Sequence, residues 1–388
     1  MSESESHSQR KQAIRDVGAV VVKVGTRVLT DQSGKLDRRR IERLSAGLCA
    51  IADTGRQTIV VSSGAVGAGI GKLDLKQRPS DLGQLQAVAA IGQTDLIQAY
   101  EVGLAKGGRH AAQVLLTAND LRRRDGYLHV RNALIRLSEM GAVAVINEND
   151  SVAVAELMTT FGDNDGLAAQ VAGLLDNCLL VILSDVDGLH DGHPSKPGSR
   201  RIPIVEVIDD RVIALANDES QTETDAALSK GGMSSKLAAA DLAMSYGHPV
   251  IIGPGHDDFV LEKVLAGDDI GTLFLPNERS LRGRRRWIRG SAAVEGHLTI
   301  DDGAARALRD QGRSLLAIGI TEVDGDFGAG AVVMIQTQQG EVVARGLCNY
   351  PAESVRSILG QPSDRIAEIL GQRPYESVVH RNNLTLHP

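Results

Sequence analysis

The sequence predicts an α/β protein with a mainly parallel sheet, followed by a smaller domain that is mainly β. Short apolar runs alternate with longer segments of helical periodicity up to about residue 265, which is typical of βαβ units with right-handed crossovers. The first run, Val20-Val21-Val22-Lys23-Val24, is almost entirely β-branched, as in strands that are covered on both faces. Beyond residue 277, short strand-like runs and glycine turns replace this pattern.

The composition restricts the class of protein. A chain of 388 residues is long enough for two domains with a sizeable core. Its net charge of −7 gives it no general attraction to nucleic acid or to anionic membranes. Cys49, Cys178 and Cys348 lie far apart in apolar runs, so we expect reduced core residues and not disulfides or a metal cluster. No run approaches the length of a membrane-spanning helix and residues 1–12 do not resemble a signal peptide; we therefore expect a cytoplasmic protein.

The expected elements follow from the apolar periodicity and from the capping residues. Residues 1–14 are polar, and we expect them to be disordered. Asp37 is expected to cap a helix that ends near Thr54, and a glycine-rich loop is expected at residues 63–71. The expected strands are 18–24, 58–62, 112–116, 142–146, 178–183 and, as the last one, 250–252; the other expected helices are 82–104, 127–140, 237–246 and 258–265. The predicted domains are 15–277 and 290–388, joined by an arginine-rich linker at 278–289.

A phosphate site is predicted where the first strand ends. Lys23 lies at the carboxyl end of that strand, where open α/β sheets bind their ligands. Gly25 would let backbone N–H groups approach a ligand, and Thr26 adds a hydroxyl donor. The alternative is a lysine that merely ends a strand and points into water.

The glycine-rich segment after the second strand matches neither of two known phosphate motifs. A P-loop needs glycine at position 66 and Ser or Thr after Lys72, and the chain has Val66 and Leu73. The dinucleotide pattern needs a third glycine where Lys72 stands. The segment is still a strand followed by small residues with backbone N–H donors, and this arrangement is suited to binding an anion. The alternative is a tightly packed turn that binds nothing.

Two polar clusters follow other predicted elements, at residues 147–150 and 162–165. Both combine amide and carboxylate side chains, which can hold an ammonium group, lysines or Mg²⁺. A solvated acidic loop is the usual alternative. A third cluster, residues 230–236, places glycines between Lys230 and Lys236 before a helix, so it predicts a second anion site; its alternative is a glycine turn with capping serines.

Taken together and in order, these motifs resemble those of the amino acid kinase family, in the branch that carries a C-terminal PUA domain and phosphorylates glutamate. The resemblance covers nearly the whole chain. The motifs that carry it are Val21-Val22-Lys23-Val24-Gly25-Thr26, Val61-Ser62-Ser63-Gly64-Ala65, Asn147-Glu148-Asn149-Asp150, Gly162-Asp163-Asn164-Asp165, Gly231-Gly232-Met233-Ser234-Ser235-Lys236 and Arg286-Trp287-Ile288. It implies an αβα sandwich with a mainly parallel sheet, and a PUA-like tail.

The resemblance also implies an activity and the residues for it. The expected reaction moves the γ-phosphoryl group of ATP, with Mg²⁺, to the side-chain carboxylate of L-glutamate, as the first step of proline synthesis. By resemblance, Lys23, Lys236 and Asp165 are catalytic, and Asp165 orients the two lysines; Ser63, Asp150 and Asn164 bind glutamate. The expected nucleotide residues are Lys23, Ser184, Asp185, Lys230, Gly231, Gly232, Met233, Ser234, Ser235 and Lys236. Ser184 replaces the usual threonine, and no residue is assigned as a metal ligand.

This chemistry needs no general base. A glutamate side chain has a reference pKa near ~4.3, so the nucleophile is already ionised at neutral pH. The difficulty lies in bringing an anion to a polyanion and in stabilising charge on the transferring phosphoryl oxygens. Two lysines and Mg²⁺ can neutralise this charge and position both groups.

Other functions remain as alternatives. Another acceptor, such as acetylglutamate or aspartate, is the nearest one, and the Ser63-Gly64-Ala65 motif with the PUA-like tail argues against it. RNA binding through the tail is disfavoured because residues 290–388 carry eight arginines, no lysines and twelve carboxylates. The arginines around Trp287 are expected to form a salt-bridged linker. The family suggests a homo-oligomer, a dimer or tetramer, with proline as feedback inhibitor; no membrane partner is expected.

Overall fold

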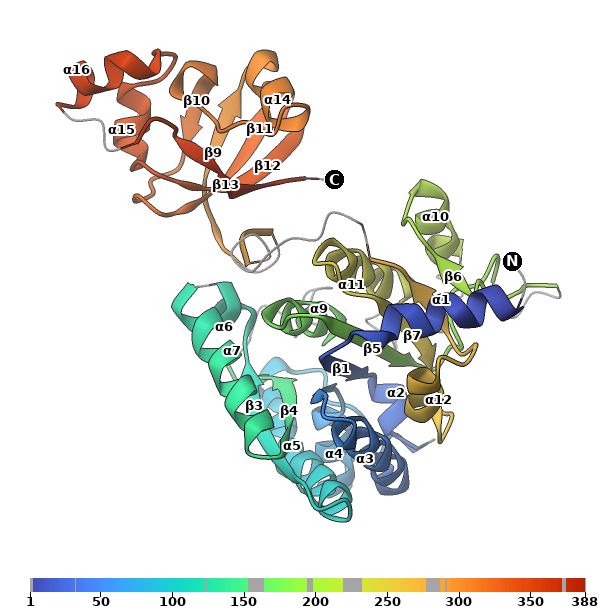
Figure 1. The fold of residues 1–388 in the computed structure, drawn as a ribbon. Coiled ribbons are helices and arrows are strands. Elements are labelled where there is room, and N and C mark those ends of the chain that lie inside the picture. Colours follow the sequence, from blue (N-terminus) through green and yellow to red (C-terminus); the bar gives the residue numbers. More distant parts are fainter. Residues whose placement is uncertain are drawn as a thin grey trace. The chain divides into compact units, whose positions relative to one another are not determined.

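The computed structural model describes residues 3–31, 33–122, 124–152, 164–193, 198–218, 232–276, 287–289, 292–371 and 375–387. The chain divides into two compact units (Figure 1). The first unit consists of Met1–Asp120 and Leu128–Leu281, and the second consists of Leu121–Tyr127 and Arg282–Pro388. Each unit has its own sheet and its own hydrophobic core.

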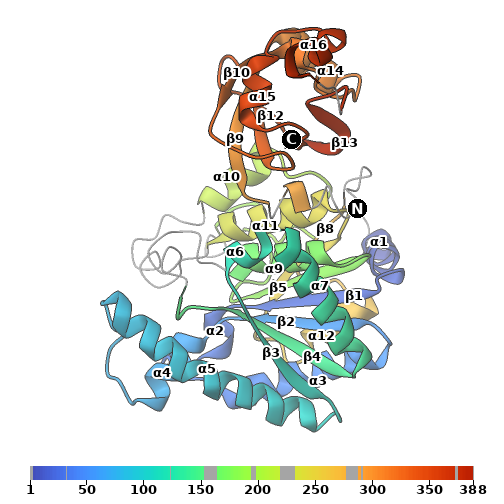
Figure 2. The same cartoon turned by 90° about the vertical axis from the view of Figure 1, so that its left-hand side faces the viewer.

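The first unit is built on an eight-stranded sheet in the order β3-β4-β2-β1-β5-β7-β8-β6 (Figure 2). All neighbouring strands pair in parallel except β7 and β8, which are antiparallel. The strands are β1 Ala19–Val24, β2 Gln57–Ser62, β3 His110–Leu116, β4 Ala142–Glu148, β5 Cys178–Ser184, β6 Ile204–Val205, β7 Val250–Pro254 and β8 Thr272–Phe274. The predicted α/β class with a mainly parallel sheet is confirmed.

Helices cover both faces of this sheet, which gives the expected αβα sandwich. The helices α7, α9 and α11 lie on one face, and α3, α5 and α12 lie on the other (Figures 1 and 2). The helices up to residue 266 are α1 Glu3–Arg15, α2 Thr26–Leu29, α3 Arg38–Asp53, α4 Ala65–Lys72, α5 Leu82–Ala105, α6 Ala118–Arg122, α7 Arg124–Glu139, α9 Asn164–Leu174, α10 Asp210–Asp218, α11 Met233–Ser245 and α12 Val260–Ala266. Asp37 caps α3 by accepting from the backbone N–H groups of Arg39 and Arg40, as predicted.

Strand β1 lies in the middle of the sheet, between β2 and β5. All six of its residues are buried. Val20, Val22 and Val24 join the core beneath α3, α5 and α12. Because successive side chains in a strand point to opposite faces, Lys23 faces the side of α9 and α11. The carboxyl ends of β1, β2, β4 and β5 lie along one edge of the sheet, since these strands are parallel.

The glycine-rich segment after β2 is a helix, so the expectation of a loop at residues 63–71 was wrong. Its glycines serve close packing between α4 and α5. A Cβ at Gly69 would lie 2.0 Å from the Val88 carbonyl oxygen, and one at Gly92 would lie 1.9 Å from the Ala65 carbonyl oxygen. Only Gly64, with φ of +103°, needs glycine for its backbone conformation.

Two other expectations were wrong. Residues expected to be disordered form α1, because Arg10 is buried and donates hydrogen bonds to the carbonyl oxygens of Pro203 (2.7 Å), Ile270 (2.8 Å) and Gly271 (2.8 Å). The strand at 250–252 is not the last one in its sheet, because β8 follows and pairs with it. A three-residue apolar run such as Thr272–Phe274 is too short to stand out as a periodic pattern.

The second unit is mainly β, as predicted. Its five-stranded sheet has the order β10-β9-β11-β12-β13 and is antiparallel except for the β9–β11 pair. Its elements are β9 Val294–Ile300, α14 Asp302–Arg309, β10 Ile320–Asp324, β11 Val332–Thr337, β12 Val342–Cys348, α15 Ala352–Ser357, α16 Ile366–Leu370 and β13 Val379–Leu386. Within this unit, the buried Trp287 donates from Nε1 to the Leu121 carbonyl at 3.2 Å.

The cysteines and the helices bear on two further expectations. Cys49, Cys178 and Cys348 are free and buried, which confirms the expectation of reduced core residues. In the part of the chain that is described, every helix is too short or too polar to cross a bilayer.

Candidate active site

A buried carboxylate lies between two lysines at the carboxyl end of β1. Asp165 has no exposed surface, and its Oδ1 lies 2.6 Å from Lys23 Nζ while its Oδ2 lies 3.7 Å from Lys236 Nζ. The side chains of Lys23 and Lys236 are only 4% and 8% exposed. Buried charges are tolerated where they are paired and hydrogen-bonded. The three formal charges sum to +1, so this centre retains a positive charge for an anion.

Three elements bring this centre together. Lys23 comes from β1, Asp165 from the first turn of α9 and Lys236 from the first turn of α11. Ser235, beside Lys236, donates from Oγ to Asp165 Oδ2 at 3.0 Å. The predicted catalytic residues therefore lie in contact, and Lys23 does not point into water.

The N-terminus of α11 supplies a second set of donors beside the lysines. This helix has 13 residues and begins after Gly232, which provides no side-chain cap. Backbone N–H groups in the first turn of a helix point outward and favour anions. Gly232, Met233, Ser234 and Ser235 lie at this end. Lys230 and Gly231, which belong to the same predicted nucleotide segment, lie outside the described residues.

Ser184 is the last residue of β5, the strand next to β1, and Asp185 follows it. In the parallel register Leu183 is opposite Val24, so Ser184 lies one position beyond the end of β1. Ser184 Oγ donates to Asp185 Oδ1 at 2.9 Å, and Arg27 donates to Asp185 Oδ2 at 2.7 Å. Burial, the largest single influence, acts to raise the pKa of Asp185, but these two hydrogen bonds together with a backbone hydrogen bond and the charge of Arg27 hold the pKa below its usual value.

A chain of buried amide groups runs from the lysine–carboxylate centre toward α5. Asn164, the neighbour of Asp165, donates from Nδ2 to Ser63 Oγ at 2.9 Å and to Asn147 Oδ1 at 3.0 Å. Asn147 in turn donates from Nδ2 to Gln93 Oε1 at 2.9 Å. These contacts bring together the ends of β2 and β4, the start of α9 and the middle of α5. Two of the predicted glutamate residues, Ser63 and Asn164, are thus in direct contact.

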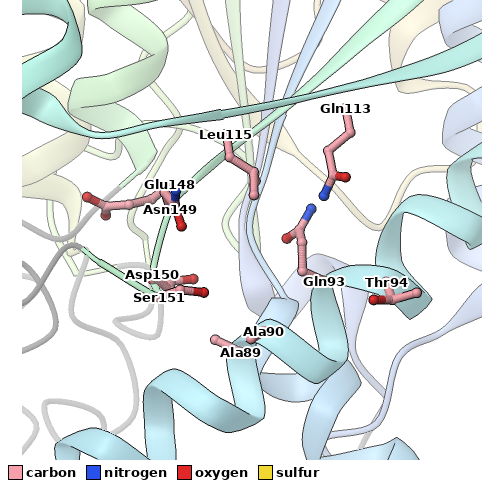
Figure 3. A pocket seen from close by; sticks show the side chains of 10 residues that line it. All are labelled: Ala89, Ala90, Gln93, Thr94, Gln113, Leu115, Glu148, Asn149, Asp150 and Ser151. Atoms are coloured by element: carbon pink, nitrogen blue, oxygen red, sulfur yellow. The ribbon is translucent and has the colours of Figure 1, made fainter.

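The third predicted glutamate residue, Asp150, lines a cavity of about 180 Å³. Figure 3 shows this cavity between α5 and the segment after β4. Burial raises the pKa of Asp150 to about 6, and the cationic Arg78 acts in the opposite direction. The lining residues are Ala89, Ala90, Gln93, Thr94, Gln113, Leu115, Glu148, Asn149, Asp150 and Ser151. Gln93 therefore belongs both to this cavity and to the amide chain.

Sequence reasoning missed Gln93 and did not single out Asn147 within its cluster. A signal for Gln93 was present. It follows Ala89 by four residues and precedes Leu96 by three, which places a polar residue on the buried stripe of a long helix. Asn147 lies at a strand end within an already recognised polar cluster, but its partner is 54 residues away in sequence.

Comparisons with known proteins give a consistent picture. Residues 18–254 match the profile of the Amino acid kinase family, and residues 296–370 match that of the PUA domain. The Glutamate 5-kinase of Rhodopirellula baltica is 60% identical over 385 residues, which is 99% of this chain and 98% of that protein. The Glutamate 5-kinase of Moorella thermoacetica is 44% identical over 385 residues, with 99% of both chains covered. Among solved structures, carbamate kinase from Giardia lamblia bound to AMP-PNP covers 68% of this chain and 99% of its own at 17% identity, with a TM-score of 0.46, a similarity too low to carry an argument.

Proposed function

The chain belongs to the amino acid kinase family and within it to the glutamate 5-kinases, and on this premise we propose the reaction and the residues that perform it. The enzyme transfers the γ-phosphoryl group of ATP to the side-chain carboxylate of L-glutamate. The product is γ-glutamyl 5-phosphate, and the reaction is the first step of proline biosynthesis.

The observation that best supports this function is the buried Lys23–Asp165–Lys236 centre. Asp165 holds one lysine at each carboxylate oxygen, at 2.6 Å and 3.7 Å. Two ammonium groups fixed in this way favour an anion whose charge grows or spreads during the reaction. The carboxylate is itself engaged by the lysines and by Ser235, so it serves to position them and does not act as a base.

The acceptor explains the absence of a base in the proposed mechanism. The side-chain carboxylate of glutamate is ionised at neutral pH, since its reference pKa is near ~4.3. Catalysis then rests on alignment and on neutralisation of charge. Lys23 and Lys236 contact the transferring phosphoryl group, and the start of α11 binds other phosphate oxygens of ATP. Ser184 and Asp185, with Lys230 to Ser235, complete the proposed nucleotide site.

Glutamate binding is proposed at the other end of the amide chain. A half-buried carboxylate such as Asp150 suits the α-ammonium group of the substrate. Asn164 and Ser63 lie between Asp150's cavity and Asp165, since Asn164 adjoins Asp165 and contacts Asn147. An acceptor that extends from Asp150 to Lys23 would place its side-chain carboxylate next to the phosphate end.

Mg²⁺ is proposed to enter with ATP. Among the described residues, no group of three His, Cys, Asp or Glu side chains could hold a metal ion. Mg²⁺ commonly keeps water ligands and binds chiefly through substrate phosphates. A site that offers lysines and backbone N–H groups to the phosphates is compatible with an ion that binds in this way. When bound, the ion neutralises phosphate charge; Lys23, Lys236 and α11 orient the same phosphates.

Three further expectations are proposed on the family relationship alone. They are a homo-oligomeric state, inhibition by proline and a cytoplasmic location. RNA binding through the PUA-like tail is not proposed. The only tryptophan of the chain, Trp287, is 6% exposed and its indole N–H is already bonded, so it offers no surface on which a base could stack.

The proposed function is tested by γ-glutamyl hydroxamate formation with ATP and Mg²⁺, in which L-glutamate, L-aspartate and N-acetyl-L-glutamate are compared. We expect a clear preference for L-glutamate. Activity confined to another acceptor would leave the phosphate centre in place but would remove the assignments of Ser63, Asp150 and Asn164.

A further inference from the structure

One backbone carbonyl group determines which side of each buried amide carries the nitrogen and which carries the oxygen. Asn164 Nδ2 lies 3.3 Å from the carbonyl oxygen of Ser62, which can only accept a hydrogen bond. Asn164 must therefore present its N–H₂ group on that side, where Asn147 Oδ1 also accepts from it at 3.0 Å. Asn147 then has its Nδ2 toward Gln93, so Gln93 presents Oε1 to Asn147 and turns Nε2 the other way.

This orientation leaves a buried donor without an acceptor. Gln93 is 7% exposed, and among the described residues its Nε2 has no hydrogen-bond partner. A buried polar group left unsatisfied costs about 1–3 kcal/mol, so the position calls for a ligand. Gln93 lines the same cavity as Asp150, and Figure 3 shows its side chain rising from α5 toward the amide of Gln113 on the opposite wall.

The backbone that carries Gln93 is closely packed. Its neighbour Gly92 lies so near α4 that a Cβ would be 1.9 Å from the Ala65 carbonyl oxygen and 2.2 Å from the Gly69 nitrogen. Both helices are buried at this crossing. A donor on such a rigid support can select a ligand by position, since little ordering of the protein is needed on binding.

The functional groups that line the cavity indicate which part of a substrate binds there. Asp150 offers a carboxylate, and Gln93 offers an N–H₂ group without an acceptor. An α-amino acid carries an ammonium and a carboxylate on one carbon atom, so it complements both walls at once. We propose that Gln93 is a specificity-determining residue, whose Nε2 donates to the α-carboxylate of the acceptor amino acid while its Oε1 holds Asn147 and Asn164 in position. This inference rests on the proposed function and adds a residue that the sequence motifs did not include.

The variant Gln93→Glu tests it, because the substitution keeps the acceptor for Asn147 and replaces the donor by a negative charge. We expect the KM for L-glutamate to rise about 10- to 100-fold, the range for a lost hydrogen bond to a charged group, while the KM for ATP and the kcat change less than about threefold. The control is Gln98→Glu, which makes the same change at an exposed position of α5.

Two competitive ligands separate recognition of the α-carboxylate from a general disturbance of the site. Glutarate lacks the ammonium group and keeps both carboxylates, whereas 4-aminobutyrate lacks only the α-carboxylate. In Gln93→Glu the Ki of glutarate should rise with the KM of glutamate, and the Ki of 4-aminobutyrate should change less than about threefold. In Asp150→Asn the pattern should reverse.

Equal weakening of both ligands in Gln93→Glu, or an unchanged KM for glutamate, would overturn the proposal. If Gln93→Glu does not fold, Gln93→Met removes the donor without adding a charge, although it also removes the acceptor for Asn147; it is held to the same ligand pattern. A wild-type enzyme that does not use L-glutamate would overturn the proposed function itself. An active wild type without this ligand pattern would overturn only the assignment of Gln93.

Discussion

The two ends of the candidate site are stabilised in different ways. At the phosphate end, two lysines and one carboxylate hold each other in place. At the acceptor end, neutral amides form a chain in which Gln93 Nε2 and Asn164 Oδ1 are buried without hydrogen-bond partners among the described residues. The proposed phosphate end is thus held together by charge pairs, whereas the proposed acceptor end keeps buried hydrogen-bonding groups that could serve a ligand.

If this comparison is right, the largest loss follows from removing the carboxylate between the lysines. Asp165→Asn leaves two buried ammonium groups facing each other without a counter-charge, and breaking such a pair costs about 3–5 kcal/mol of stability. We expect a lower melting temperature and a kcat reduced at least about 100-fold, since the lysines lose their fixed positions. Thermal unfolding and steady-state kinetics measure both. A variant with wild-type kcat would show that the lysines do not depend on Asp165.

Removing one lysine should affect the reaction more than the binding of the acceptor. In Lys236→Ala we expect kcat to fall about 100- to 1,000-fold, as when a donor to a developing charge is lost, with little change in the KM for glutamate. Lys263→Ala is the matched control, because Lys263, which lies on α12, forms an ion pair with Asp257 at the surface. A rise in the KM for glutamate alone would move Lys236 to the acceptor end.

At the proposed acceptor end, Asp150 should affect the affinity for glutamate and not the affinity for ATP. Asp150→Asn removes the partner of the substrate ammonium group, and we expect the KM for glutamate to rise about 10-fold, the lower end of the range for a charge-assisted hydrogen bond. The KM for ATP should stay near the wild-type value. A parallel loss of ATP affinity would place Asp150 on the metal or nucleotide side.

The smallest effect is a pH dependence confined to the acceptor end. Because burial raises the pKa of Asp150 to about 6, its carboxylate is charged above that pH and becomes protonated as the pH falls through it. The KM for glutamate should therefore be flat above about pH 7 and rise below about pH 6, toward a limit of about the tenfold increase expected for Asp150→Asn. The same profile measured on Asp150→Asn should lack this rise. A rise that persists in that variant would belong to another group.

The sequence motifs include every charged residue of the lysine–carboxylate centre but miss part of the amide chain. Lys23, Asp165 and Lys236 lie in motifs that can be read locally, because each is placed by a strand end or by the first turn of a helix. Ser63 and Asn164, which belong to two different motifs, lie in contact, since Asn164 Nδ2 is 2.9 Å from Ser63 Oγ. Sequence analysis did not identify Gln93 as a candidate site residue, because its position in the site depends on a hydrogen bond from Asn147, which is remote in sequence.

What the sequence determined by itself was the fold class and most of the central strands and helices of the first unit. Period-two and helical patterns are local properties that can be recognised in a short segment. The pairing of Asp165 with the two lysines was expected only from the resemblance to the family. Only the tertiary structure decided that residues 65–72 form a helix, because their glycines matter through contacts with Val88 and Gly92 on α5. It alone decided that α1 is ordered, through the carbonyl oxygens around Arg10. The tertiary structure also decided the orientation of the amide groups of Asn164, Asn147 and Gln93. Such an orientation is assigned from the hydrogen-bond partners of the amide, and these partners come from different parts of the chain.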